Sequence, residues 1–496
     1  MKKIGLALAC LLPVLIAAAQ APVVKKAPLA VRASSLPASV DNTAQKYFPP
    51  LIDQKGGSCA QASAIGYMFT YEMNRLLDRD ASASAAYRFS YQYTYNFVND
   101  GEDNGSFGWD GLSIASANGI ITEADWPSSS ASSFRWASGY EKYFNGIRYK
   151  VKSFEMIDID KWDDLAQVKQ FLYDRGEEGR PGGIVVFSTK ASNWKMDNNY
   201  TGPSTTDYHT ILTALATEGG HALTIAGYDD LVEFTTPSGE VSKGAFIVVN
   251  TWGSYSHDNG RFYLPYWFFF NNAGSAYLSP YVTTVEPKYE EPKIVFKVGV
   301  ECDSRNDLSF KLGVSDKASD TTPKQSMQVR IADYQGGDYP MQGSWWPSDI
   351  EFGFDFCAYA STVDAIEHPS YFLTVARNKR GSQAATVARL TAFSVYDYRS
   401  GSTPVVHTYD LPEPVDLSGG DNVFSLSTVP PAKTSYSPVE WLNKQSRQPV
   451  AAPLVVRTAD GKFAKVRLSD YDRTAGTIRI KYVYNPNGGR NLQGKR

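Results

Sequence analysis

The sequence predicts an α+β fold over residues 36–285, followed by an all-β, sandwich-like domain over residues 294–430. Helical and strand-like segments alternate irregularly in the first region. In the second region apolar residues alternate with more polar ones, as in Ile294–Cys302 and Ile350–Phe356, and turn residues separate these runs. Several short strands without helices between them are typical of a β-sandwich.

Two proline-containing stretches divide the chain. Residues 286–293 hold Pro287 and Pro292 among charged residues, which predicts a linker between the two domains. A second stretch, which begins at Pro430, precedes a small β-rich C-terminal segment over residues 431–496. Within this segment, residues 463–468 and 477–484 have strand-like patterns and are expected to pair.

The N-terminus has the composition of an export signal. Lys2 and Lys3 precede the apolar run Ile4–Ala18, and the small residues that end at Ala19 suit a signal peptidase. We therefore expect residues 1–19 to be a signal peptide and residues 20–35 to be a flexible lead-in. The mature protein would be periplasmic, cell-surface or extracellular. Because the apolar run is too short to span a bilayer comfortably and no second run follows, no membrane span is expected in the mature chain.

Composition excludes several classes of function. The chain is 43% hydrophobic and 20% charged, as in folded globular proteins. Its formal net charge is only -3, without the basic surface that nucleic-acid binding requires. No Cys/His cluster has zinc spacing, and no glycine-rich phosphate loop is present. We therefore expect no nucleic acid, no metal and no cofactor.

The cysteine count points to a free thiol. Removal of residues 1–19 leaves Cys59, Cys302 and Cys357, an odd number, so at least one is unpaired in a monomer. A free thiol in an oxidising compartment is a liability unless it is buried or useful. Whether Cys302 pairs with Cys357 stays open, because Cys302 lies on the apolar face of its strand and Cys357 falls opposite such a face.

Cys59 is the first candidate functional residue. The apolar residues behind it recur at helical spacing: Ile65, Met68, Phe69, Met73, Leu76 and Leu77. With Ser58 as the expected N-cap, Cys59 lies in the first turn of this helix, where the helix dipole favours a thiolate. Gly56 and Gly57 just before it leave room for a substrate backbone. A nucleophile and a buried structural cysteine both fit this pattern.

Two further candidates lie near strands. Gly219 and Gly220 precede His221, which opens a short apolar strand, and Asn250 ends a β-rich run before Thr-Trp-Gly. Taken singly, these residues also fit a structural histidine and a turn-forming asparagine.

Together, the three motifs resemble the papain-like cysteine peptidases. The order is Cys, His, Asn, with Gln54 shortly before Cys59 and Trp-Gly shortly after Asn250. Gly-His-Ala at His221 and Asn-Thr-Trp-Gly at Asn250 are its most specific parts. The resemblance covers about residues 36–285 and implies a two-lobed catalytic domain.

The resemblance also implies roles. Cys59 attacks the scissile carbonyl as a thiolate, and His221 takes the thiol proton and later protonates the leaving amine. Asn250 holds the imidazole in the required tautomer. The Cys59 backbone N–H and the Gln54 side-chain amide form the oxyanion hole.

Substrate binding is expected nearby. Trp252 shields the contact between His221 and Asn250 from water. Gly105 and Gly108 bind the substrate backbone in extended form. The other histidines, among them His209 and His257, lie in polar turns or in the β region and are expected to have no catalytic role.

Some features depart from the family pattern. Gln54 precedes Cys59 by five residues where the family has six, and Gly56 and Ala60 stand where the family has a disulfide cysteine and a tryptophan. Only residues 20–35 separate the signal from the catalytic region, so a large helical prodomain is not expected.

The predicted function is that of a secreted cysteine peptidase that hydrolyses protein or peptide substrates. Two alternatives stay open. The first is a catalytically silent papain-like scaffold that serves binding or adhesion, with the C-terminal β region contacting a surface or protein partner. The second is a transpeptidase or amidase that uses the same acyl-enzyme.

Overall fold

The computed structural model describes residues 23–29, 36–130, 132–272, 277–332, 337–379, 381, 384–429, 454–457, 462–472 and 477–485. The chain divides into two compact units, Met1–Val429 and Pro430–Arg496. The predicted signal peptide, residues 1–19, lies outside the described residues. Among the helices that are described, none is both long enough and apolar enough to cross a membrane.

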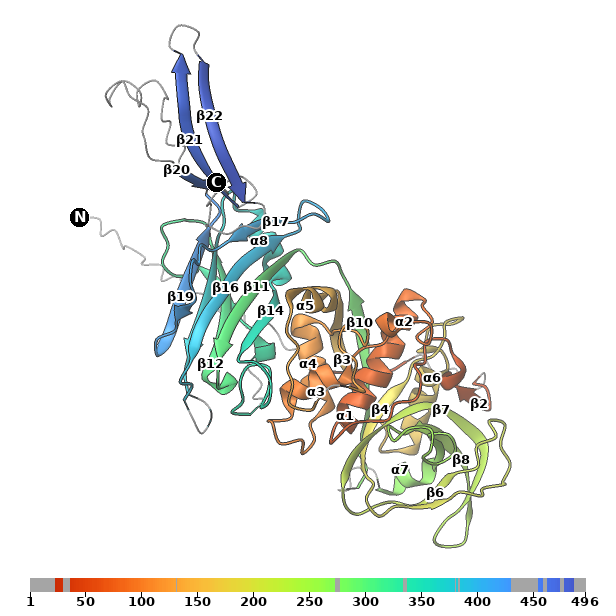
Figure 1. The fold of residues 1–496 in the computed structure, drawn as a ribbon. Coiled ribbons are helices and arrows are strands. Elements are labelled where there is room, and N and C mark those ends of the chain that lie inside the picture. Colours follow the sequence, from red (N-terminus) through yellow and green to blue (C-terminus); the bar gives the residue numbers. More distant parts are fainter. Residues whose placement is uncertain are drawn as a thin grey trace, which may run out of the picture. The chain divides into compact units, whose positions relative to one another are not determined.

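One long helix that begins at Cys59 forms the centre of the helical lobe (Figure 1). It consists of α1 (Cys59–Gln61), a π-helical segment (Ala62–Phe69) and α2 (Thr70–Leu77). The π-helical segment is buried throughout, in agreement with the apolar periodicity of the sequence. Around it pack α3 (Tyr91–Val98) and α4 (Gly108–Asn118), and α5 (Tyr140–Ile147) contacts α4.

A large mixed sheet forms the second lobe. Its strand order is β1-β3-β10-β4-β7-β8-β9-β6-β5, with β2 paired to β7. The strands are β1 (Val23–Lys25), β2 (Ser39–Asp41), β3 (Tyr149–Asp158), β4 (Val185–Lys190), β5 (Lys195–Asp197), β6 (Ile211–Ala214), β7 (Gly220–Thr235), β8 (Val241–Val249), β9 (Arg261–Pro265) and β10 (Tyr281–Tyr289). Helices α6 (Trp162–Asp174) and α7 (Tyr266–Asn272) pack against β7 and β8, respectively. The sheet has its own hydrophobic core, so the predicted α+β region has helical and β parts with distinct cores.

The structure differs from the expectation that residues 20–35 are a flexible lead-in. Val23–Lys25 form β1, which pairs in parallel with β3. Lys25 and Lys26 form ion pairs with Asp158 and Glu155 of β3. The Leu29 N–H donates to the side-chain oxygen of Gln167 at 2.7 Å. Within this segment the structure describes residues 23–29, whose lysines pair with acidic residues more than a hundred positions along the chain.

The first half of the predicted linker over residues 286–293 is strand. Strand β10 continues to Tyr289 and pairs antiparallel with β3 as far as Tyr149. Pro287 is tolerated because the register shifts between Glu286 and Pro287. At such a bulge the residue need not donate a backbone N–H to the neighbouring strand, and proline has none. Only residues 290–293 connect this strand to the next domain.

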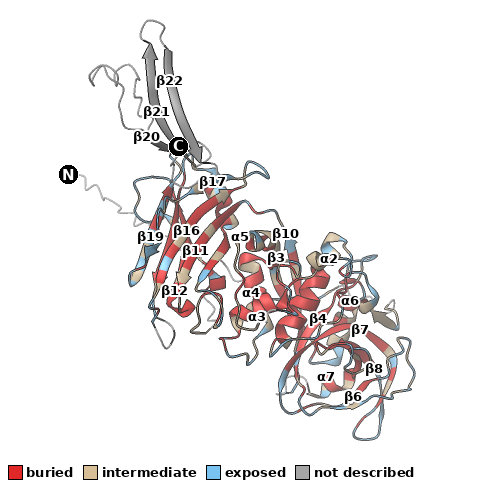
Figure 2. Ribbon diagram, in the orientation of Figure 1, coloured by how far each residue is buried: buried red, intermediate tan, exposed pale blue. Residues whose placement is uncertain are grey.

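Residues 294–429 form two sheets with short helical turns. One sheet has the order β14 (Asp349–Asp355), β11 (Ile294–Cys302), β16 (Ala388–Asp397) and β17 (Val405–Thr408), with β18 (Val415–Asp416) beside β16. The other has the order β13 (Gln325–Gln328), β12 (Leu308–Ser315), β15 (Ser370–Arg377) and β19 (Gly420–Ser427). Helix α8 (Ala360–Asp364) follows β14. The apolar residues that alternate along β11 and β14, such as Phe296, Val298 and Phe352, are fully buried (Figure 2).

The cysteines of this domain do not pair. The Cys302 thiol donates to the carbonyl of Ser304 at 3.2 Å. The Cys357 sulfur accepts from the Lys293 N–H at 3.1 Å. All three cysteines among the described residues are free thiols, which answers the question that the sequence left open.

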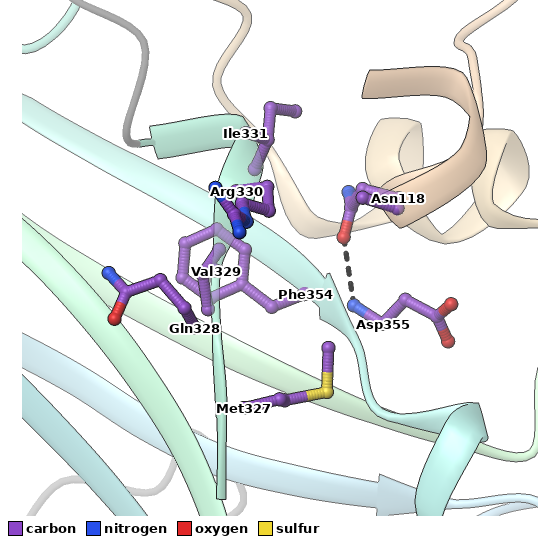
Figure 3. A pocket seen from close by; sticks show the side chains of 9 residues that line it. Asn118, Met327, Gln328, Val329, Arg330, Ile331, Phe354 and Asp355 are labelled. Atoms are coloured by element: carbon purple, nitrogen blue, oxygen red, sulfur yellow. Dashed lines mark hydrogen bonds between the residues drawn. The ribbon is translucent and has the colours of Figure 1, made fainter. Parts of the chain in front are cut away.

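The helical lobe and the sandwich meet at the end of α4. Asn118 donates to the carbonyl of Gly353 at 3.1 Å and accepts from the Asp355 N–H at 2.9 Å (Figure 3). Lys150 of β3 forms an ion pair with Asp355. Beside Asn118, residues of β13 and β14 line a small cavity. The ring of Tyr143 on α5 lies 5.6 Å from that of Phe352, so one core extends from α5 into the sandwich.

In the second unit, Pro430–Arg496, the described residues form three strands. They are β20 (Leu454–Arg457), β21 (Phe463–Asp472) and β22 (Thr477–Asn485). Strands β21 and β22 pair antiparallel, which confirms the expected pairing of residues 463–468 with 477–484. Strand β20 extends this sheet on the other side of β21.

Candidate active site

Cys59 is the first residue of the long helix, as the apolar spacing predicts. The expected cap by Ser58 is absent. Its hydroxyl donates to the carbonyl of Lys55 at 2.7 Å and closes the preceding turn, so it makes no hydrogen bond to the helix. The first helical hydrogen bond runs from the Ala62 N–H to the Ser58 carbonyl at 2.9 Å. Cys59 is therefore held in the first turn by the backbone.

A carboxylate fixes the loop before Cys59. The Gly57 N–H donates to Asp103 Oδ1 at 2.9 Å, and the Tyr95 hydroxyl donates to the same oxygen. Gly56 has φ +60°, and a Cβ built on it would lie 2.3 Å from the Asp103 carboxylate oxygens. This contact requires glycine at position 56. Hydrogen bonds to Asp103 thus hold the loop where the expected pattern has a disulfide.

His221 and Asn250 are in direct contact. His221 lies at the start of β7 and Asn250 directly after β8, and both are buried. The His221 Nε2 and Asn250 Oδ1 atoms are 2.9 Å apart. The Thr251 backbone N–H donates to the same Oδ1 at 2.7 Å. Because a backbone N–H can only donate, Oδ1 is the acceptor for both, and His221 carries its proton on Nε2.

Cys59 lies against the strand that carries His221. Helix α1 packs on β7, and the Ala222 backbone, next to His221, is close enough to the thiol of Cys59 to lower its pKa. The Ser63 hydroxyl, one turn further along the helix, donates to the Ala222 carbonyl at 3.0 Å. Helix α1, which begins at Cys59, therefore packs against the strand that carries His221, and His221 in turn contacts Asn250 after β8.

Burial sets the charge state of the pair. Burial raises the pKa of the Cys59 thiol, although hydrogen bonds from the Ala222 and Ala60 backbones oppose this shift. Burial likewise lowers the pKa of His221, against the hydrogen bond to Asn250. Both directions favour a neutral thiol beside a neutral imidazole. Burial of the charge therefore opposes the stabilisation that the first helical turn gives to a thiolate.

Two tryptophans cover the imidazole. The Trp252 ring stacks on His221 with the ring centroids 4.7 Å apart and the planes at 29°. Trp194 lies 5.4 Å from Trp252 and 6.2 Å from His221. Trp252 has the position expected of a shield. Sequence reasoning missed Trp194 because it lies in a polar insert, far from any recognisable motif.

Gln54 lies beside the site despite its shorter spacing from Cys59. Its backbone N–H donates to the Thr251 carbonyl at 2.7 Å, and its side-chain oxygen accepts from the Thr251 hydroxyl. Its Nε2 donates to the carbonyl of Gly56 at 2.9 Å. An amide nitrogen has two hydrogens, so this contact uses one of them.

Gly105 and Gly108 are placed differently from each other. Gly105 has φ +105°, and its backbone nitrogen would lie 2.7 Å from a Cβ built on Gly57, so it lies beside the Cys59 loop. Gly108 begins α4, where a Cβ would lie 3.3 Å from that of Ala64. Close packing of α4 on the Cys59 helix therefore accounts for the glycine at 108. The exposed rings of Phe107 and Trp109 stack beside it, with centroids 4.7 Å apart.

His257 contacts the site, although the sequence analysis predicts no catalytic role for it. Its Nε2 lies 2.8 Å from Asn250 Nδ2. It lies in the turn between Trp252 and β9, and the Asn250 N–H donates to the Gly260 carbonyl at 2.9 Å, which folds this turn back onto Asn250. The sequence signal is only its closeness to Asn250 ahead of the Asn259–Gly260 turn.

Metal chemistry has no evident site in the described part of the chain. No group of three or more His, Cys, Asp or Glu side chains there is arranged to hold a metal ion.

No protein-family model matches the sequence, and no curated protein matches it. Solved structures similar to the chain include cysteine proteases. Xylellain, a cysteine protease from Xylella fastidiosa, is 19% identical with a TM-score of 0.37, over 53% of this chain and 91% of that chain. Procathepsin L 3 from the larval midgut of Tenebrio molitor is 16% identical with a TM-score of 0.35, over 54% and 75%. The stem bromelain precursor is 15% identical with a TM-score of 0.35, over 53% and 74%. These values are too low to assign a family or an activity.

Proposed function

We propose that this protein is an exported, papain-like cysteine peptidase that hydrolyses peptide bonds in protein or peptide substrates. The hydrogen bond between His221 Nε2 and Asn250 Oδ1, beside the sulfur of Cys59, carries the proposal. A buried structural cysteine would need no imidazole with a fixed tautomer next to it. The pattern of residues 1–19 supports export.

In the proposed mechanism, His221 acts through its other ring nitrogen. Its Nε2 proton is committed to Asn250, so Nδ1 has the lone pair that accepts the thiol proton of Cys59. The thiolate attacks the scissile carbonyl, and the imidazolium then protonates the leaving amine. His221 next takes a proton from water, which hydrolyses the thioester and restores the thiol. Since burial disfavours each charge alone, thiolate and imidazolium form together as a pair.

Cys59→Ala is the decisive variant. With a diverse peptide library, the full chain is expected to cleave peptides and to be labelled by a thiol-directed epoxide at Cys59, and the variant is expected to do neither. Cys357→Ala serves as the matched control, because burial raises the pKa of Cys357 to about 12 and leaves it a poor nucleophile. Cleavage that persists without the Cys59 thiol would refute the proposal, and so would epoxide labelling confined to other cysteines.

We further propose that Gln54 and the Cys59 backbone N–H form the oxyanion hole. Gln54→Ala is expected to lower kcat by about 10²-fold with little change in KM, because such donors act mainly on the transition state. Steady-state kinetics on a cleaved peptide measures this effect. Gln167→Ala, a change in α6, is the matched control. A normal kcat in Gln54→Ala would remove the side chain from the mechanism.

A further inference from the structure

The Asn250 amide is held at both ends. At its oxygen end, His221 Nε2 and the Thr251 N–H lie at 2.9 and 2.7 Å. At its nitrogen end, His257 Nε2 lies at 2.8 Å. The Thr251 contact fixes which end is oxygen, so the group that faces His257 is the NH₂ group.

This geometry determines the protonation state of His257. An amide nitrogen donates and does not accept, so His257 Nε2 must be unprotonated to receive its hydrogen. The neutral ring therefore has its proton on Nδ1. A protonated His257 would present an N–H to the Asn250 NH₂ group, and two donors cannot bond to each other. The contact then favours a turned amide, which would place nitrogen toward His221 Nε2.

We propose that His257 is a positioning residue that keeps the Asn250 oxygen toward His221 only while its own ring is neutral. The role rests on the proposed peptidase function of the site. In neutral solution His257 supports the tautomer of His221 in which Nδ1 can accept the Cys59 proton. In acid, protonated His257 favours the turned Asn250 amide and so opposes this tautomer of His221. Protonation of either His221 or His257 therefore removes the base that accepts the Cys59 proton.

The surroundings of His257 keep its ring neutral near pH 7. Three aromatic rings lie within about 6 Å of it, those of Trp194, Trp252 and Phe262. Burial, followed by the charge of His221, lowers the pKa of His257 to about 4. The ionisable side chains of the neighbouring elements are those of Cys59, His221 and Arg261, together with Asp53, Asp258 and its ion-pair partner His209.

The pH dependence of Cys59 alkylation follows from the lowered pKa of His257. His257 is neutral above about pH 4 and becomes a cation as the pH falls through that value. Below it, the rate of Cys59 alkylation by an epoxide should fall with about the second power of the proton concentration, one proton for each histidine. In His257→Gln the side-chain oxygen can accept from Asn250 and does not titrate, so the fall should follow about the first power.

The experiment compares His257→Gln, His257→Leu and the control His209→Gln in the full chain. His209 is an exposed histidine, so its replacement should leave both the rate and its pH dependence unchanged. At neutral pH, His257→Gln should alkylate within about threefold of the unmodified protein, whereas His257→Leu, which lacks an acceptor, should be roughly tenfold slower. Circular dichroism at each pH shows that the loss precedes unfolding. A Leu variant that matches the unmodified protein, or a Gln variant that resembles Leu, would overturn the proposal.

A second measurement, of the His257 tautomer, requires neither catalysis nor a substituted protein. Nitrogen-15 NMR of the unmodified protein near neutral pH should show His257 Nε2 without a proton and Nδ1 with one. Protonated Nε2 at that pH would refute the role of His257 even if the protein cleaves peptides. Conversely, the expected tautomer together with the expected alkylation profile would support it even if no peptide is hydrolysed, so the two proposals fail separately.

Discussion

Removal of the sandwich is expected to abolish cooperative folding of the region that carries Cys59. A chain that ends at residue 293 should lack the sharp thermal transition of the full chain and should expose apolar surface. A chain that ends at residue 429 should unfold at the same temperature as the full chain, because Pro430–Arg496 is a separate compact unit. Differential scanning calorimetry and binding of a hydrophobic dye measure both outcomes.

The reason is that the helical lobe has no complete core without the sandwich. Tyr143 of α5 is buried against Phe352 of β14, and a Cβ built on Gly353 would lie 2.8 Å from the Tyr143 Cβ. Loss of Phe352 packing alone is expected to cost about 3–5 kcal/mol. Whole domains are stable by only about 5–15 kcal/mol, so the loss of many such contacts removes the native state.

Polar groups at this junction add to the penalty. Lys150 is buried and forms its ion pair with Asp355, which the truncation removes. Lys150 would keep its second partner, Glu290, at 3.1 Å, so this loss should cost less than the about 3–5 kcal/mol expected for a buried charge left without any partner. Asn118 would also lose both of its partners, Gly353 and Asp355.

Phe352→Ala tests the same contact without shortening the chain. Its unfolding midpoint should fall, whereas an exposed residue of the sandwich, as in Trp345→Ala, should leave the midpoint unchanged. A fragment ending at residue 293 that melts cooperatively near the temperature of the full chain would show that the catalytic region folds independently.

The parts of the fold that the sequence predicts correctly are those that local residue patterns determine. Apolar spacing identified the helix from Cys59, and strict alternation identified β11 and β14, because side-chain periodicity follows directly from backbone geometry. The motifs around His221 and Asn250 pointed to two residues that the structure places 2.9 Å apart.

The errors have a common physical cause, which is contact between residues far apart in sequence. The prolines of residues 286–293 indicated a linker, but pairing of β10 with β3 extends the strand to Tyr289. Residues 20–35 were expected to be a flexible lead-in, but two lysines of this segment form ion pairs with carboxylates on β3. His257 was expected to have no role, but the turn that carries it folds back so that its ring contacts the Asn250 side chain.

Glu72→Ala is expected to destabilise the protein by about 3–5 kcal/mol, because it removes a fully buried carboxylate that pairs with the buried Arg175 and the partly buried Arg75. Glu72 lies in α2 and is fully buried. Its carboxylate accepts from Arg175 Nη1 at 2.7 Å and from Arg75 Nε at 3.0 Å. The surface pair of Glu233 with Lys243 is the matched control, and Glu233→Ala should change stability by less than about 1 kcal/mol. Urea unfolding, followed by tryptophan fluorescence, measures both values.

The same carboxylate should also affect the candidate active site. Glu72 Oε1 accepts from the Ile184 N–H at 3.3 Å, just before β4, the strand in which Thr189 pairs with His221. Glu72 therefore joins the helix that begins at Cys59 to the strand beside His221.

Glu72→Gln keeps the shape of the side chain but loses its charge, so it should weaken both arginine contacts and lower stability less than Glu72→Ala. If Glu72→Ala unfolds at the same urea concentration as Glu233→Ala, the buried cluster does not stabilise this junction. If it is less stable as expected, the rate of Cys59 alkylation in the folded fraction should fall with it, because the two halves of the site are then held less firmly together.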